Sequence, residues 1–173
     1  GLDETFQAAA FIGYHSRAGA NTSPLAHTMT GGVVRITVNG RDASEFLLNT
    51  YTAAMLKVPV IFVSGDKGLC EEVMELNPNI GTVAVKEGVG DSTISIHPEL
   101  ATLLIKEGVA KAMRGDLSKC LVTLPEHYSV DIQYKDHTKT HTRFYPSANL
   151  KDPLTVHFEH SDYYEVLRFL YLP

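Results

Sequence analysis

The chain has 173 residues, of which 44% are hydrophobic, and a formal net charge of −5. This length is enough for one large domain or two small ones with a buried core. The acidic balance argues against nucleic acid or an anionic membrane as the main partner, and no apolar run approaches the ~20 residues that a membrane helix requires. Cys70 and Cys120 belong to no CxxC pair, which favours a reducing compartment, so we expect a cytoplasmic protein.

The N-terminal residues predict a strand, a loop and a second strand. Residues 8–14 are small and apolar, and their length favours a buried strand that ends at His15. Residues 16–24 are polar and contain Gly and Pro, which is typical of a loop. Residues 33–38 alternate between apolar and polar side chains, which is the period of a half-buried strand.

Helices and strands then alternate up to residue 88. Asp42 is placed to cap a helix, with Glu45 three residues later at the capping-box position. The elements expected after this helix are strand 60–63, which ends at Ser64-Gly65-Asp66, helix 69–76 and strand 82–86. The alternation predicts a layered α/β part over residues 1–88.

The second half indicates a smaller α+β part over residues 89–173, with a boundary at the turn-forming sequence Gly88-Val89-Gly90-Asp91. The elements expected there are strand 92–96, an amphipathic helix from 97–99 onward, strands 130–134 and 154–158, and a last helix capped by Ser161-Asp162. His137 and His141 lie four residues apart, but no Glu follows the first, so we expect a polar loop or strand edge.

His15 and His27 are candidate functional histidines. His15 lies where an apolar strand ends, and in open α/β sheets ligands bind outside the carboxyl ends of strands. An imidazole there can bind a divalent metal, although the residues alone favour the simpler interpretation, a hydrogen-bonded histidine at a strand end. His27 follows the loop, and its ordinary pKa of ~6.5 suits a general acid or base. The alternative is a surface histidine.

Three further side chains are candidates, each with a simpler structural alternative. Glu45 can be a rigid carboxylate ligand or only a helix cap. Asp66 can orient a ligand or form a turn and cap the next helix. Lys86 can reach an acidic substrate or an oxyanion, or it is a solvated lysine at a strand end.

Several segments together resemble the D-aminopeptidase family of zinc peptidases that is associated with bacterial dipeptide transport. The resemblance covers nearly the whole chain and is carried by Gly1-Leu2-Asp3-Glu4-Thr5-Phe6, Gly13-Tyr14-His15-Ser16-Arg17-Ala18, Ala26-His27-Thr28-Met29, Ser44-Glu45, Leu48-Asn49, Ser64-Gly65-Asp66 and Ala84-Val85-Lys86. Gly-Tyr-His followed by a second His and by Glu is the most specific combination.

The resemblance implies a function and a role for each residue. His15 and Glu45 match zinc ligands, and His27 matches the catalytic histidine. To these roles we add Asn49, Asp66 and Lys86 as residues that line or support the substrate pocket. It also implies two zinc ions in the complete protein, hydrolysis of short peptides with an N-terminal D-residue such as D-Ala-D-Ala, and a homo-oligomeric ring.

The chain also departs from the family pattern. The family's other ligands come from an Asp-x-Glu strand end and from an Asn-Asp-Ser-His-like motif, and neither occurs in this sequence. We therefore expect a chain that is incomplete at its N-terminus and inactive alone. Two alternatives stay open: another metal-dependent amidohydrolase on the same scaffold, or a truncated subunit without catalysis.

Overall fold

The computed structural model describes residues 1–142 and 145–171, which divide into two units. Unit 1 consists of Gly1–Ser16, Ala20–Ala26 and Phe46–Leu124, and unit 2 of Arg17–Gly19, His27–Glu45 and Pro125–Pro173. This division differs from the predicted parts 1–88 and 89–173. The chain does not leave its sheet at residue 88, because β5 (Gly81–Val89) turns back there and pairs with β6 (Ser92–Ser95).

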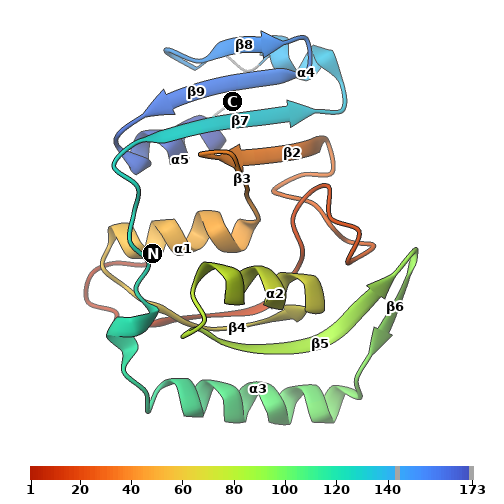
Figure 1. The fold of residues 1–173 in the computed structure, drawn as a ribbon, viewed down its shortest axis with the longest axis vertical. Helices are drawn as coiled ribbons and strands as arrows, with labels where there is room; N and C mark the ends of the chain where they lie inside the picture. The colour runs from red at the N-terminus through yellow and green to blue at the C-terminus, as the bar shows by residue number, and fades with distance from the viewer. Residues whose placement is uncertain (143–144, 172–173) are drawn as a thin grey trace. The chain divides into compact units, whose positions relative to one another are not determined.

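Unit 1 is built on a four-stranded sheet in the order β1-β4-β5-β6. β1 (Ala9–Tyr14), β4 (Val60–Asp66) and β5 are parallel, and β6 pairs antiparallel with β5. The helices that follow these strands are α2 (Lys67–Leu76), α3 (Pro98–Ala112) and the 3-10 helix η1 (Leu117–Cys120). α2 and α3 lie on opposite faces of β4 and β5 (Figure 1), which makes this unit the predicted α/β layered structure.

The strands of unit 1 are buried to different degrees. All seven residues of β4 are buried, as expected for a central strand of a parallel sheet that carries helices on both faces. β1 has the predicted bounds within one residue, but the prediction that it is buried is wrong. It lies at the edge of the sheet order, and Ile12 is 51% exposed.

Unit 2 contains a five-stranded antiparallel sheet in the order β3-β2-β7-β9-β8. Its elements are β2 (Val33–Val38), β3 (Arg41–Asp42), β7 (Tyr128–Tyr134), β8 (Asn149–Asp152), β9 (Thr155–His160), α4 (His137–Thr142) and α5 (Tyr163–Tyr171). β7 alternates between buried and half-buried residues, so one face of the sheet is apolar. α5 packs there, and the rings of Phe158 and Phe169 stack 4.8 Å apart. Asp162 begins α5 as predicted, because its carboxylate accepts from the N–H of Tyr164.

Two local predictions are wrong. Asp42 does not cap a helix: it lies in β3, pairs with Thr37, and forms ion pairs with Arg17 and Arg35. The helix α1 (Glu45–Met55) begins three residues later. The segment with His137 and His141 is the short helix α4 rather than a loop or strand edge. None of the helices in the described ranges is long and apolar enough to cross a bilayer.

Candidate metal centre

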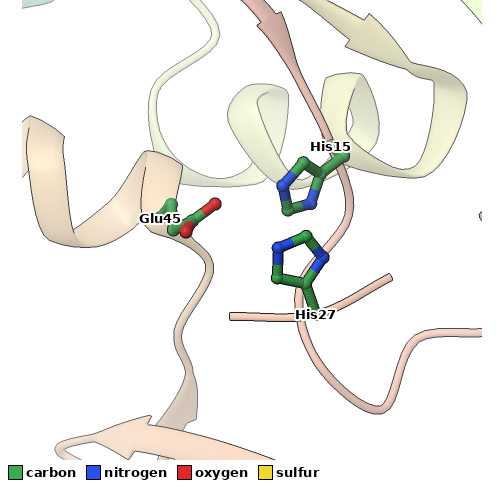
Figure 2. Close-up of side chains that lie close together, drawn as sticks. All are labelled: His15, His27 and Glu45. Atoms are coloured by element: carbon green, nitrogen blue, oxygen red, sulfur yellow. The ribbon is translucent and has the colours of Figure 1, made fainter. Parts of the chain in front are cut away.

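Three of the predicted site residues come together. His15, His27 and Glu45 each contribute one ligand atom, and these atoms all lie within 4.8 Å of one another. Figure 2 shows the two imidazoles and the carboxylate turned toward a common point. All three side chains are half-buried.

His15 is positioned by the end of β1. Tyr14, the last residue of β1, pairs with Gly65 of β4, and a Cβ atom at Gly65 would overlap the carbonyl oxygen of Tyr14. The close approach of the two strands therefore requires glycine at residue 65. The Nδ1 atom of His15 lies 3.0 Å from the carbonyl oxygen of Ser16. Because a carbonyl only accepts, Nδ1 carries the proton, and Nε2 is then the nitrogen with a lone pair for a metal.

Glu45 and the segment that carries His27 are held together by hydrogen bonds. Oε1 of Glu45 accepts from the backbone N–H of Met29 at 3.0 Å. Thr28 is fully buried, and its hydroxyl donates to the carbonyl of Ala43 (2.9 Å). Met29 has a φ of 63°, a left-handed conformation that is uncommon for residues other than glycine and is often found at functional sites. Glu45 is therefore not the partner of an Asp42 cap, and its carboxylate faces the histidine segment.

The three residues predicted to support the pocket have different surroundings. Asn49 donates a hydrogen bond to the Tyr14 hydroxyl (3.0 Å), next to His15 in the chain. Asp66 is fully buried and caps α2 by accepting from Leu69 N–H, as the simpler alternative predicts. Lys86 is half-buried on β5, with its backbone opposite Asp66. The role of these side chains toward a substrate stays a prediction.

The two cysteines do not form a second reactive centre. Both are free and buried. Burial raises the pKa of Cys70 to about 11, so its reactive thiolate form is scarce at neutral pH. Burial also raises the pKa of Cys120.

Sequence reasoning missed several residues that organise this region. Ser16 and Thr22 are joined by a hydrogen bond between their hydroxyl groups (2.8 Å), and Ser16 is also bonded to Asp66. Met29 binds the carboxylate of Glu45 through its backbone, which no side-chain motif signals. A hydroxyl residue directly after a strand-end histidine was the one available hint for Ser16.

A family model described as D-aminopeptidase matches residues 1–172. The chain belongs to the D-aminopeptidase family. The family predicted from the Gly-Tyr-His, His and Glu motifs is thereby confirmed, and so is the α/β fold class.

Two relatives in the D-aminopeptidase family show how much of the chain is matched. The D-aminopeptidase of Bacillus subtilis (strain 168) is 43% identical over 89 residues, which are 51% of this chain and 32% of the relative. A solved structure, the Zn-dependent D-aminopeptidase DppA from Bacillus subtilis, a self-compartmentalizing protease, matches with a TM-score of 0.85 and 31% identity. That match covers 99% of this chain and 65% of DppA, so the chain spans less than two thirds of either relative.

Proposed function

We propose that this chain is the metal-binding part of a zinc-dependent D-aminopeptidase, which removes an N-terminal D-residue from short peptides such as D-Ala-D-Ala. The observation that carries the proposal is the convergence of His15, His27 and Glu45 in a member of the D-aminopeptidase family. The activity named for the relatives agrees with it.

The donor atoms fit zinc. The imidazole nitrogen of His15 and the carboxylate oxygen of Glu45 belong to the mixed N and O set that catalytic zinc sites use, and the ring of His27 lies beside them. The hydrogen bond from His15 Nδ1 to the Ser16 carbonyl fixes the tautomer that such a ligand needs. A second zinc ion in the complete protein would need ligands beyond these three, and we include it in the proposal.

Each residue then has a distinct role. When bound, zinc would supply an activated water and polarise the scissile carbonyl. His15 and Glu45 would hold the ion. His27 would take up or release a proton, as an imidazole does near neutral pH. Asn49, Asp66 and Lys86 would support these groups or the substrate.

Substitution of the histidines tests the proposal and separates the two roles. In the full-length protein, His15→Ala should lower both zinc content and release of D-alanine from D-Ala-D-Ala, because it removes a ligand. His27→Ala should abolish hydrolysis, by a factor of about 100 or more, with zinc content nearly unchanged. Zinc is measured by elemental analysis and D-alanine by chromatography. L-Ala-L-Ala and a non-peptide amide are the control substrates.

The outcomes distinguish the alternatives. Equal loss of zinc and activity in His27→Ala would make His27 a ligand rather than a proton carrier. Cleavage of the non-peptide amide without cleavage of the D-dipeptide would favour another amidohydrolase. An unaltered protein with much less than one zinc per chain would contradict the enzyme proposal.

We also propose that the protein assembles with copies of itself and works in the cytoplasm. DppA is described as self-compartmentalizing. In this chain, Val89 and Ile94 on the hairpin of β5 and β6 are 56% and 67% exposed, and a contact with another copy would cover them. The mass of the full-length protein in sedimentation equilibrium decides between an oligomer and a monomer.

A further inference from the structure

Asp66 makes more hydrogen bonds than a helix cap requires. It is 0% exposed at the carboxyl end of β4, and its Oδ1 accepts from the backbone N–H of Leu69 (2.9 Å) to cap α2. Its Oδ2 accepts from the backbone N–H of Ser16 (2.7 Å), and the Ser16 hydroxyl donates a short hydrogen bond to Oδ1. Only the bond to Leu69 is needed for capping. The two bonds to Ser16 therefore need another explanation.

Ser16 links Asp66 to the candidate metal ligand. Ser16 follows His15, and its carbonyl accepts the proton on Nδ1 of the His15 ring. Because the N–H and the hydroxyl of Ser16 are both bound to one buried carboxylate, Ser16 cannot turn without breaking both bonds. The carbonyl that orients the imidazole is therefore fixed by Asp66. Partners of this kind set the orientation and tautomer of metal-binding histidines.

Thr22 extends the network in one direction. A serine hydroxyl has a single proton, and Ser16 gives it to Asp66, because a carboxylate only accepts. In the 2.8 Å contact between the hydroxyls of Ser16 and Thr22, Thr22 must then be the donor. The order of donation is Thr22 to Ser16 to Asp66.

Thr22 also fixes the loop that leads to His27. Its carbonyl accepts from the backbone N–H of Gly88 (3.1 Å) in β5. Its side chain packs on Gly68 in the first turn of α2, where an added Cβ would overlap the threonine. A Cβ at Gly88 would lie 2.6 Å from the Cα of Ser23. The loop 20–26 is therefore closely fitted to α2 and β5, and His27 is the next residue along the chain.

We propose that Asp66 is a positioning residue for metal binding. Through Ser16 it sets the ring of His15, and through Ser16 and Thr22 it anchors the loop that precedes His27. The proposal rests on the zinc function proposed above and assigns the preorganisation of that site to a carboxylate that does not bind the ion.

The test removes the hydroxyl groups one at a time and measures zinc binding without catalysis. Ser16→Ala and Thr22→Val each remove one hydroxyl of the network, and Thr22→Val keeps the shape that packs on Gly68. Thr52→Val is the matched control, because the Thr52 hydroxyl bonds only the Leu48 carbonyl within its own helix (2.9 Å). In the full-length protein, zinc affinity is measured by competition with a chelator, ligand geometry by the visible spectrum of bound Co²⁺, and folding by the melting temperature.

We expect Ser16→Ala and Thr22→Val to fold, with melting temperatures lower by a few degrees. Both should weaken zinc binding about tenfold or more and shift the Co²⁺ bands. The loss of zinc affinity in the double variant should be smaller than the product of the losses in the two single variants, since both hydroxyls act through one network. Thr52→Val should bind zinc as the unaltered protein does.

Asp66→Asn completes the series. It keeps one acceptor oxygen but places an NH₂ group against donors, so we expect the largest loss of zinc affinity where the variant folds. Unchanged zinc affinity and Co²⁺ spectra in Ser16→Ala and Thr22→Val would overturn the proposal and leave Asp66 as a helix cap. Binding of zinc without cleavage of D-peptides would refute the proposed activity alone. Failure of the unaltered protein to bind zinc would refute both.

Discussion

Asp66 and Asp131 are both aspartates with several hydrogen bonds, but they occupy different environments. Asp66 is fully buried in unit 1, and its donors are two backbone N–H groups and a hydroxyl. Asp131 lies on the polar face of the sheet in unit 2, with its side chain 25% exposed. Its donors are the Lys151 ammonium and the His157 ring, each at 2.7 Å. The two aspartates accept a similar number of hydrogen bonds, but water reaches the donors around Asp131 more easily than those around Asp66.

That difference predicts how each aspartate contributes. The donors around Asp66 cannot turn to water when the carboxylate is removed, and an unpaired buried donor is costly. Lys151 is 58% exposed and reaches solvent easily. Exposed ion pairs of this kind contribute little to folding. We therefore expect the carboxylate of Asp66 to stabilise the fold strongly and that of Asp131 to stabilise it little.

The largest effect is expected from Asp66→Ala, because it leaves the N–H groups of Ser16 and Leu69 buried and unpaired. We expect a loss of about 3–5 kcal/mol in the free energy of unfolding. Denaturant unfolding followed by circular dichroism measures it. A loss below about 1 kcal/mol in the free energy of unfolding would show that Asp66 contributes no more to stability than Asp131.

Gly65→Ala should have an intermediate effect. The added methyl group would overlap the carbonyl of Tyr14, so the end of β1 must shift, at a cost of about 1–3 kcal/mol. Gly90→Ala is a useful comparison, because a Cβ at residue 90 meets no atom within 4 Å, although its φ of 58° carries its own strain. Gly65 does not have a positive φ, so its loss reports the contact with Tyr14, and a negligible loss in Gly65→Ala would show that the end of β1 moves without cost.

The smallest effect is expected from Asp131→Asn, at about 0.5–1 kcal/mol at pH 7. Burial raises the pKa of Asp131, but the hydrogen bonds from Lys151 and His157 outweigh it and lower the pKa below its ordinary value. The stabilisation is therefore present above the unfolded pKa of ~3.9 and is lost as the pH falls through the lower folded value. Unfolding of both proteins at pH 7 and pH 3 checks this, and a difference that grows in acid would contradict it.

The sequence was informative where the signal is local. The alternation of residues 33–38 predicts β2 with its observed bounds, and the apolar run at 60–63 predicts the first four residues of β4. The histidines and Glu45 were found through a motif, since each alone has a simpler explanation. The prediction that these three side chains come together depends on the family resemblance and not on the periodicity of the sequence.

Long-range contacts were the part that could not be predicted. β2 pairs with β7, about ninety residues later in the chain, which is why residues 27–45 belong to unit 2 and the predicted division at residue 88 does not follow the sheets. The local spacing of Asp42 to Glu45 predicts a helix cap, whereas the arginines that bind Asp42 come from other segments. Ser16 and Asp66 are separated by fifty residues, and no local pattern relates them.

The fit of Thr22 against Gly68 has a consequence for how this protein can change over generations. A side chain at residue 68 would occupy space that the threonine already fills. An alanine at residue 68 is therefore tolerated only after residue 22 has been replaced by a smaller one. We expect the two positions to covary, with the change at residue 22 coming first. Libraries for directed evolution should randomise them as a pair, because single changes at residue 68 will be lost from the population first.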